Sequence, residues 1–465
     1  GPAAQGGYEE GSSESSPAGE TVPAAGSARE SDQGGLADPQ LSPEQTVAGK
    51  CMTCHKKETP GLYRQWYMSA HAMHNVTCIE CHGAVRTDED AYLHEGAYIA
   101  TLVTPIDCGR CHKREAEEVQ GSYHARAGEI LESADAYMAH AAGGEPAAIA
   151  GCESCHGTRV KIDPNAPNKL ARESWPNSGV GRLNPDGSKG ACNACHARHS
   201  FDKAQARQPE SCGKCHLGPD HPQKEVYEES KHGNAYYTHV DDMNLEAERW
   251  VVGVDYWEAP TCASCHMSAT NKQPVSHDAG GRISWTLRPA ISVMKDDWQR
   301  KRANMMQVCT ACHHGEFIKG HYYQMDGVIQ LYNQKFAEPA GAIMSMIREK
   351  GLLENPSSFS NDIEWIYWEL WHHEGRRARH GAAMMGPDYT WWHGIYDVAH
   401  NFYFEFLPAA RAYEDEQVNA YIDDLIADEP MHQWMKRPTE QIKQDIRTGG
   451  LQAIYDGLYH PAGEK

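Results

Sequence analysis

Apolar residues recur at helical spacing in the last third of the chain. This pattern predicts long helices over residues 324–336, 340–351 and 361–381, followed by a helical stretch from 386 towards 427. Before residue 321 the helical pieces are short, as at 202–211, and Gly and Pro separate them, with little of the two-residue alternation that marks strands. The sequence therefore predicts a mostly α-helical fold whose long helices lie in the C-terminal part.

Composition divides the chain further. Residues 1–45 are dominated by Gly, Ser, Pro, Ala and Glu, a mixture too polar to offset the entropy lost on ordering, so we expect a flexible leader. The chain does not begin with Met, which is what removal of a signal peptide would produce. We expect a second part over 46–320, which holds all the cysteines, and a helical C-terminal domain over 321–465.

The chain is acidic, with 64 Asp and Glu against 43 Lys and Arg and a net charge of -21. Such a charge disfavours binding to nucleic acid or anionic lipid and favours basic partners. No apolar run approaches the roughly 18 residues that a membrane-spanning helix needs. We therefore expect a soluble protein with no transmembrane segment and no nucleic-acid partner.

Every cysteine belongs to a C-x-x-C-H motif. The thiols are Cys51, Cys54, Cys78, Cys81, Cys108, Cys111, Cys152, Cys155, Cys192, Cys195, Cys212, Cys215, Cys262, Cys265, Cys309 and Cys312. The histidines that complete the motifs are His55, His82, His112, His156, His196, His216, His266 and His313. C-x-x-C-H is the attachment signature of c-type haem, in which both thiols bond to the haem and the imidazole binds iron from one side. The motifs predict eight covalently bound haems per chain.

Other uses of these cysteines fit the pattern less well. A disulfide framework needs no His after every second Cys, and a zinc site or a redox C-x-x-C does not recur eight times with that His unchanged. The motifs are crowded into residues 51–313, which leaves too little chain for eight separate folds and indicates that haem replaces much of the side-chain core. Because haem is attached covalently outside the cytoplasm, we expect a periplasmic or otherwise extracytoplasmic protein.

A surplus of histidines outside the motifs offers ligands for the second side of each iron. Three of them share the form Ser-x-His followed by a small residue, which would let the porphyrin approach the backbone: His71, His124 and His232. Further candidates are His94, His199, His277, His380 and His393. Taken singly, each of these histidines could equally be an exposed or hydrogen-bonded residue rather than an iron ligand. The set is nevertheless large enough to supply the second ligand at seven or eight irons.

The stretches between the motifs resemble the octahaem hydroxylamine oxidoreductase and hydrazine dehydrogenase family over about residues 48–435. The resemblance is carried by "CGKCHLGPDHPQKEVYEESKHG", "CASCHMSATNKQPVSHDAGGRISW", "CTACHHGEFIKGHYYQMD" and "GPDYTWWHGIYDVAHNFY". It implies that seven haems carry two histidine ligands and relay electrons, while the fourth, at Cys152, Cys155 and His156, leaves a position open for a nitrogen substrate.

The same resemblance implies distal acid–base groups. It assigns them to the adjacent pair Asp220 and His221 and to a tyrosine in "HYYQMD", either Tyr322 or Tyr323. A carboxylate beside an imidazole can accept and pass on the protons that oxidation of N–H and O–H bonds releases. Without the resemblance, Asp220 would be read as a turn residue after Gly-Pro.

The aromatic stretch 386–403 needs its own explanation. On a regular helix, Tyr389, His393, Tyr396, His400 and Tyr403 would share one narrow face, with Trp391, Val398 and Phe402 turned away. The resemblance implies that a tyrosine from this region bonds covalently to the catalytic haem of a neighbouring subunit in a trimer, a modification associated with oxidation. We place it at Tyr396, with Tyr389 and Tyr403 as alternatives. Ordinary packing of an aromatic helix is the competing interpretation.

These features favour an oxidoreductase that converts hydroxylamine to nitric oxide or nitrite and passes electrons to a basic partner such as a small cytochrome c. Hydrazine oxidation is a close variant. A reductive octahaem nitrite or hydroxylamine reductase is an alternative, although related reductases often carry C-x-x-C-K at the catalytic haem and every motif here ends in His. A non-catalytic electron conduit, with every iron six-coordinate, is the third possibility.

Overall fold

The computed structural model describes residues 46–459, and burial of the side chains at 130–132 and 134 is not described. The predicted leader over 1–45 lies outside the described residues. The chain divides into two compact units. The first extends to Ser211 and includes the short segments His266–Ser268 and Pro274–Gly281, and the second comprises Cys212–Cys265, Ala269–Gln273 and the chain from Arg282 onward. The predicted boundary near residue 320 falls instead within one continuous helix, α16 (Gly315–Tyr332).

The first unit is built from short helices joined by loops. Its elements are α1 (Val47–Glu58), α2 (Pro60–Tyr67), α3 (Ala70–Met73), α4 (Cys78–His82), β1 (Tyr92–His94), β2 (Ala97–Ile99), α5 (Pro105–Gly109), α6 (Lys113–Gln120), η2 (His124–Glu132), α7 (Ala134–Met138), η3 (Ala139–Gly143), α8 (Glu145–Ala150), α9 (Cys152–His156), η4 (Cys192–Ala194), α10 (Lys203–Arg207) and α11 (Pro209–Gly213), which ends in the second unit. The strands β1 and β2 form an antiparallel hairpin. Its apolar core is small, and one cluster contains only Leu102, Val160 and Leu170 as buried members.

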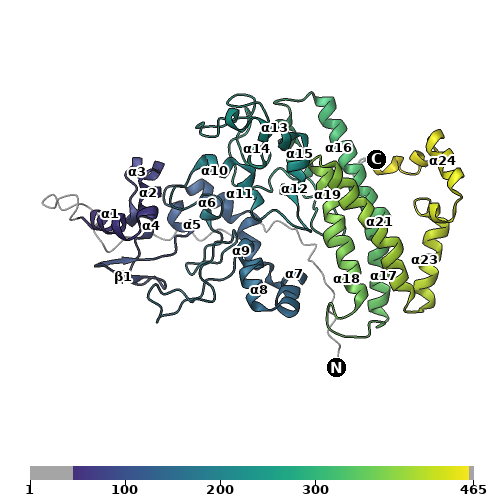
Figure 1. The fold of residues 1–465 in the computed structure, drawn as a ribbon, viewed down its shortest axis with the longest axis horizontal. Coiled ribbons are helices and arrows are strands. Elements are labelled where there is room, and N and C mark those ends of the chain that lie inside the picture. Colours follow the sequence, from purple (N-terminus) through teal and green to yellow (C-terminus); the bar gives the residue numbers. More distant parts are fainter. Residues whose placement is uncertain (1–45, 460–465) are drawn as a thin grey trace. The chain divides into compact units, whose positions relative to one another are not determined.

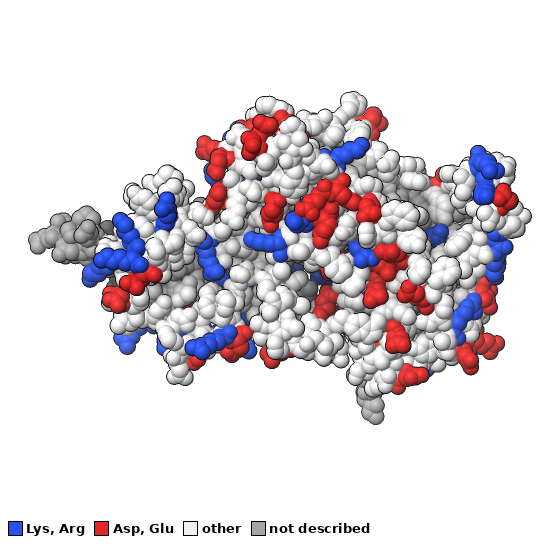
Figure 2. Space-filling model, in the orientation of Figure 1, with Lys and Arg blue, Asp and Glu red and all other residues white. Residues whose placement is uncertain are grey.

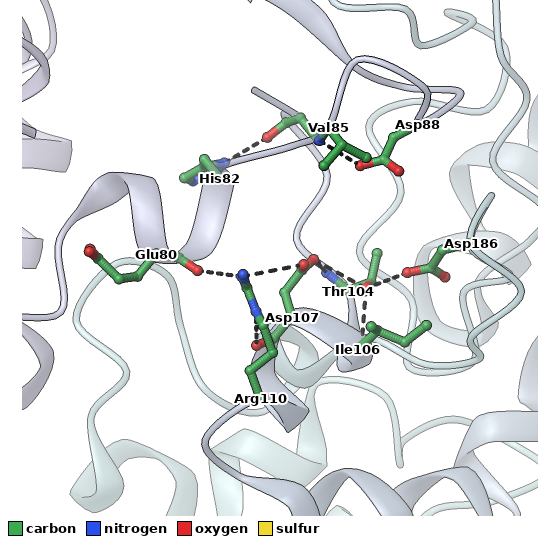
Figure 3. Close-up of polar contacts among 10 residues, drawn as sticks. Glu80, His82, Val85, Asp88, Thr104, Ile106, Asp107, Arg110 and Asp186 are labelled. Atoms are coloured by element: carbon green, nitrogen blue, oxygen red, sulfur yellow. Dashed lines mark hydrogen bonds and ion pairs between the residues drawn. The ribbon is translucent and has the colours of Figure 1, made fainter. Parts of the chain in front are cut away.

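Capping boxes begin two short helices that carry a motif cysteine. Thr77 and Glu80 form a capping box, so α4 starts at Cys78, and Thr104 and Asp107 do the same for the helix α5 that holds Cys108. The Thr104 hydroxyl also lies 2.6 Å from Asp186 Oδ2 and ties this helix start to a distant loop of the same unit (Figure 3). Local sequence thus fixes where these cysteines sit on their helices.

The second unit contains the long helices. Its elements are α12 (Gln223–Glu229), α13 (Lys231–Thr238), η5 (Val240–Asp242), α14 (Cys262–His266), α15 (Trp298–Cys309), α16, η6 (Asn333–Ala337), α17 (Glu338–Glu349), α18 (Asp362–Trp368), η7 (Glu369–Glu374), α19 (Gly375–Ala383), α20 (Pro387–Thr390), η8 (Trp391–Tyr396), α21 (Asp397–Asn401), η9 (Phe402–Phe406), α22 (Leu407–Arg411), α23 (Glu416–Asp428), η10 (Gln433–Lys436), α24 (Thr439–Thr448), α25 (Gly450–Ala453) and η11 (Asp456–Tyr459). The prediction of a mostly helical chain with long C-terminal helices is confirmed.

The long helices of this unit lie side by side as a bundle (Figure 1). Its core is aromatic and aliphatic, with Phe336, Phe402 and Phe406 almost fully buried. Four π-helical turns, η6 to η9, interrupt the α-helical hydrogen bonding of the long helices. Each such turn shifts the helical register, and π turns are often found at functional sites.

A buried ion pair joins three elements of the second unit. The Arg302 guanidinium of α15 lies 2.7 Å from both carboxylate oxygens of Asp326 on α16, and Trp285 Nε1 donates to Asp326 Oδ1 at 2.8 Å. The guanidinium also lies 4.4 Å from the Tyr322 ring centroid. The pair is almost inaccessible to solvent, with side-chain exposures of 11% and 3%. Losing one partner would therefore leave a charge buried without compensation.

Replacing Asp326 with Asn should lower the free energy of unfolding by about 3–5 kcal/mol, because Arg302 would keep its charge in a buried site without an anion. Denaturant titration followed by circular dichroism would measure the loss. The matched control is Glu316→Gln, which breaks the exposed pair with Lys319 and should have no measurable effect. Equal stability of the Asp326 variant and the wild type would show that this network does not hold the helices together.

Candidate metal centres and active site

All sixteen motif cysteines are free thiols, and none forms a disulfide. Cys54, Cys111, Cys152 and Cys312 are exposed and the others are partly buried. Free thiols with two residues between them, each pair followed by an imidazole, are the donor set that covalent c-type haem requires. The free thiols leave every motif available for covalent haem.

Six motif histidines each have a second histidine ring opposite. The distances between ring centroids are 6.2 Å for His55–His94, 6.3 Å for His82–His199, 6.2 Å for His112–His71, 6.5 Å for His196–His277, 6.1 Å for His216–His221 and 6.0 Å for His313–His232. Because an imidazole nitrogen binds a metal at about 2.0–2.1 Å, two rings on opposite sides of one metal have centroids roughly 6 Å apart. The gaps therefore fit a haem iron between each pair of rings.

Five of the eight predicted distal histidines occupy these opposed positions: His71, His94, His199, His232 and His277. Two of them reveal what the Ser-x-His sequence does. Ser69 and Ser230 are helix N-caps whose hydroxyls accept from the backbone of α3 and α13, which places His71 and His232 in the first turn of a short helix. At these two positions the Ser-x-His sequence therefore places an imidazole in the first turn of a short helix.

The surroundings favour neutral imidazoles, the form that binds a metal. Burial and the nearby His277 lower the pKa of His196 to about 4, and burial and the nearby His82 lower the pKa of His199 to about 4. His82 Nδ1 lies 2.8 Å from the Ala100 carbonyl, and His266 Nδ1 lies 3.2 Å from the Ala279 carbonyl. Such contacts orient the ring and leave Nε2 for the metal.

The remaining predicted distal histidines differ in their placement. Burial lowers the pKa of His124. Burial and the nearby Arg379 lower the pKa of His380 to about 3, and its Nε2 lies 3.1 Å from Gln223 Nε2. His393 is exposed, its Nδ1 lies 2.7 Å from Asp388 Oδ2, and its ring stacks on Tyr389. Ligation by His393 therefore stays a prediction.

Asp220 and His221 lie together, as their adjacency suggests. Asp220 Oδ1 is 3.2 Å from His221 Nδ1, without the alignment of a hydrogen bond. Arg376 of α19 holds the carboxylate from the other side, with Nη1 3.4 Å from Asp220 Oδ2 and 2.9 Å from His372 Nε2. Both residues of the pair remain partly accessible, at 23% and 35%. The arrangement can exchange protons with a small molecule while Arg376 fixes its position.

The ring of His221 also lies opposite the ring of His216. The His221 imidazole is therefore placed where it could either bind iron or transfer protons. The fourth motif, at Cys152, Cys155 and His156, belongs to the first unit, whereas Asp220 and His221 belong to the second.

The two candidate tyrosines of "HYYQMD" point to different surroundings. Tyr322 is buried beneath the Arg302 guanidinium, and burial raises the pKa of its phenol. Tyr323 is 47% exposed and its ring stacks on Tyr459 of η11 with centroids 4.5 Å apart.

The predicted Tyr/His face holds only in part. His393, Tyr396 and His400 are exposed and Tyr389 is half-buried, but Tyr403 is buried, with its hydroxyl 2.8 Å from His432 Nδ1. Of the three residues expected to turn away from this face, Trp391 is 50% exposed, whereas Val398 and Phe402 are buried. The π turns η8 and η9 explain the difference, because they shift the register assumed for a regular helix.

Sequence reasoning missed a group of ionisable residues on η7 and α19. The group comprises His372, His373, Glu374 and Arg376, within the stretch "HHEGRRARHG". The number of titratable residues in one otherwise buried helix is the signal that could have revealed this group. Burial lowers the pKa of His373 to about 4 and raises that of Glu374 to about 8.

None of the helices in the described chain has the length and apolar character needed to cross a membrane. On the face shown in Figure 2, Asp and Glu alternate with Lys and Arg rather than forming a single acidic area. Part of the net charge comes from residues 1–45, which contain eight Asp or Glu and one Arg. The total charge therefore does not locate a partner surface by itself.

Comparison with known proteins gives three kinds of match. Residues 185–358 match a family model described as "Seven times multi-haem cytochrome CxxCH". A probable nitrite reductase-hydroxylamine oxidoreductase fusion protein from Kuenenia stuttgartiensis is 27% identical over 74% of this chain. The match covers 49% of that relative, so the chain spans about half its length.

Two solved structures share the fold. A hypothetical multiheme protein superimposes with a TM-score of 0.71 and 26% identity, covering 81% of this chain and 96% of that one. A reducing HAO-like protein complex from Kuenenia stuttgartiensis, where HAO stands for hydroxylamine oxidoreductase, gives a TM-score of 0.58 and 21% identity, covering 80% and 86%. These matches, together with the C-x-x-C-H motifs and the opposed histidines, show that the chain is similar to multihaem c-type cytochromes, among them a hydroxylamine oxidoreductase fusion protein.

Proposed function

We propose that this cytochrome oxidises hydroxylamine to nitric oxide or nitrite at its fourth haem, with seven further haems relaying the electrons. The observation that carries the proposal is the Asp220–His221 pair, held by a buried arginine and partly open to solvent. The 27% identity to a protein whose name includes hydroxylamine oxidoreductase supports the substrate class.

Eight covalent haems are proposed because eight complete motifs use all the cysteines. Each motif would supply two thioethers and one axial imidazole, and five opposed histidines, His71, His94, His199, His232 and His277, would supply second ligands. When bound, the haems supply one-electron redox chemistry at iron. The chain's own contribution is to orient the imidazoles, keep them neutral and exclude other ligands.

Oxidation of hydroxylamine to nitric oxide releases three protons together with three electrons, and the electrons need an external one-electron carrier. His221 would accept a proton from the substrate while Asp220 stabilises the resulting charge. Arg376 keeps the Asp220 carboxylate in place through its contacts with His372 and the Arg288 carbonyl. Tyr322 or Tyr323 is the further proton donor that the family resemblance suggests.

Tyr396 is proposed as the residue that bonds covalently to the catalytic haem of a neighbouring chain in a homotrimer. Its 47% exposure and its position beside the exposed Trp391 and Trp392 support contact with another molecule. Such a bond would distort the macrocycle and favour transfer of electrons from the substrate over the reverse.

Reduction of nitrite or hydroxylamine is the second candidate function. It is favoured by the name of the Kuenenia relative, which includes nitrite reductase. The covalent tyrosine distinguishes the two directions, because a reductive enzyme would lack it.

We further propose that the protein works in the periplasm or another extracytoplasmic space, where c-type haem is attached. The net charge of -21 favours a basic acceptor such as a small cytochrome c, whose association should slow as salt screens the attraction. Hydrazine remains an alternative substrate of the same class.

Replacing His277 with Ala should convert one low-spin haem to a high-spin form, because the ring opposite His196 would be gone. Electron paramagnetic resonance would measure the change, and the intact mass should still include eight haems. His239→Ala is the control, since His239 is exposed and pairs with Asp242. An unchanged spectrum in the His277 variant would remove it from the ligand set.

Replacing Asp220 with Asn should lower kcat/KM for hydroxylamine by roughly a hundredfold, because His221 would lose the anion that stabilises its protonated form. Haem content and the low-spin spectrum should stay the same. The matched control is Asp242→Asn, which removes the carboxylate of an exposed Asp–His pair. Loss of haem instead of activity would assign Asp220 a structural role.

Replacing Tyr396 with Phe should abolish any haem-linked oligomer that survives on denaturing gels and should shift activity from oxidation towards reduction. Haem-stained gels and mass spectrometry of haem peptides would detect the bond directly. Tyr389→Phe and Tyr403→Phe test the neighbouring positions. If the wild type runs as a monomer and the Tyr396 variant oxidises hydroxylamine normally, the bond does not form at Tyr396.

A further inference from the structure

The ring of Phe201 contacts histidines from two of the opposed pairs in the first unit. Its centroid lies 5.0 Å from that of His71, which faces His112, and 6.4 Å from that of His199, which faces His82. The Phe201 ring stands nearly perpendicular to both imidazoles, at 81° and 84°. Edge-to-face packing is a favourable arrangement of aromatic rings at such distances. One side chain therefore contacts the proposed second ligands of two irons.

The backbone of Phe201 has a conformation that bulky residues rarely adopt. Its φ angle is +51°, in the left-handed region that favours glycine. Residues strained in this way persist only where the surrounding contacts hold them, and they gather at functional sites. The Phe201 N–H donates to the Ala197 carbonyl at 2.8 Å, and Asp202 caps helix α10 directly after it. These bonds hold the chain in the turn that directs the ring at the two histidines.

A second contact joins the same two segments of the chain. The backbone N–H of His199 donates to Gln65 Oε1 on α2 at 3.3 Å, and Ser69 caps the short helix α3 that carries His71. The segments therefore meet both at Gln65 and at the Phe201 ring. Because the backbone is held on both sides, the freedom left to each imidazole is rotation of its ring.

The orientation of an imidazole matters at a haem iron. A ring bound through one nitrogen can still turn about that bond, so the groups packed against it set its plane. The planes of the two imidazoles at one iron affect the g values of a low-spin ferric haem, and an apolar surrounding raises its reduction potential. The ring planes differ by 79° for His71 and His112 and by 37° for His199 and His82.

We propose that Phe201 is a shared positioning residue, which fixes the imidazole planes of His71 and His199 and keeps water away from them. The haems of the second and third motifs are thereby tuned by one side chain. The role rests on the proposed function for the ligation by these two histidines. It does not depend on the substrate, and it serves oxidation and reduction alike because it concerns the electron relay.

The two haems are identified first. His71→Ala and His199→Ala should each convert one low-spin haem to a high-spin form, and the electron paramagnetic resonance signal lost in each variant belongs to the haem concerned. If either variant leaves every signal unchanged, that histidine is not a ligand, and a role for Phe201 shared between two haems is overturned.

Phe201→Leu then removes the flat ring and keeps an apolar side chain. The g values of the two identified signals should shift, while those of the other haems stay as in the wild type. The matched control is Phe404→Leu, because Phe404 is 59% exposed and its ring contacts His400, an exposed histidine outside the proposed ligand set. Unchanged g values in Phe201→Leu, or a shift at every haem, would contradict the proposal.

Phe201→Gly tests the exclusion of water. Glycine adopts the left-handed backbone without strain, so the variant should fold and its intact mass should include as many haems as the wild type. Spectroelectrochemical titration should show two haems with lowered reduction potentials, because water stabilises the more highly charged oxidised iron. Potentials equal to those of the wild type would overturn the proposal, and loss of haem would do so by showing a role in folding.

These measurements need no substrate, so they separate this inference from the proposed reaction. A protein that leaves hydroxylamine unchanged but shows the two-haem response in the Phe201 variants loses the reaction and keeps the positioning role. A protein that oxidises hydroxylamine without that response keeps the reaction and loses the role.

Discussion

An iron atom bound by two imidazoles sets a fixed distance between the chain segments that carry them. In this structure six histidine pairs meet that distance, with ring centroids 6.0–6.5 Å apart, and they join segments far apart in the sequence such as those of His82 and His199. In the proposed arrangement, thioethers would fix each haem to one segment and the opposite histidine would fix it to another. The first unit can therefore remain ordered with short helices and a small apolar core.

The second unit combines haem attachment with an ordinary helical core. Its bundle buries aromatic side chains such as Phe336 and Phe402, and buried arginines tie the helices together. Arg302 is neutralised by Asp326, and Arg376 links Asp220 to His372. Buried guanidinium groups with several partners hold their surroundings in one arrangement, because moving any partner would leave a charge without compensation. This rigidity positions the acid–base pair.

The π turns connect the bundle to its chemistry. In η7 the register shift accompanies a run of ionisable residues in which Glu374 is buried beside Asn401, while in η8 it accompanies the exposure of Tyr396. The acid–base pair and the proposed covalent tyrosine therefore depend on buried charge and on departures from regular helix geometry. Such departures are stable only because the surrounding bundle is well packed.

The sequence by itself determined the haem-attachment motifs, the helical C-terminal part and the adjacency of Asp220 to His221, because each depends on residues that are neighbours along the chain. It could not determine which histidine faces which motif, since His196 and His277 meet only after the intervening chain has folded. It also could not show that Tyr403 is buried while Tyr396 is exposed, because helix periodicity assumes a constant 3.6 residues per turn that the π turns break. The raised pKa of Glu374 was equally invisible, because burial is a property of the packed bundle rather than of the local sequence.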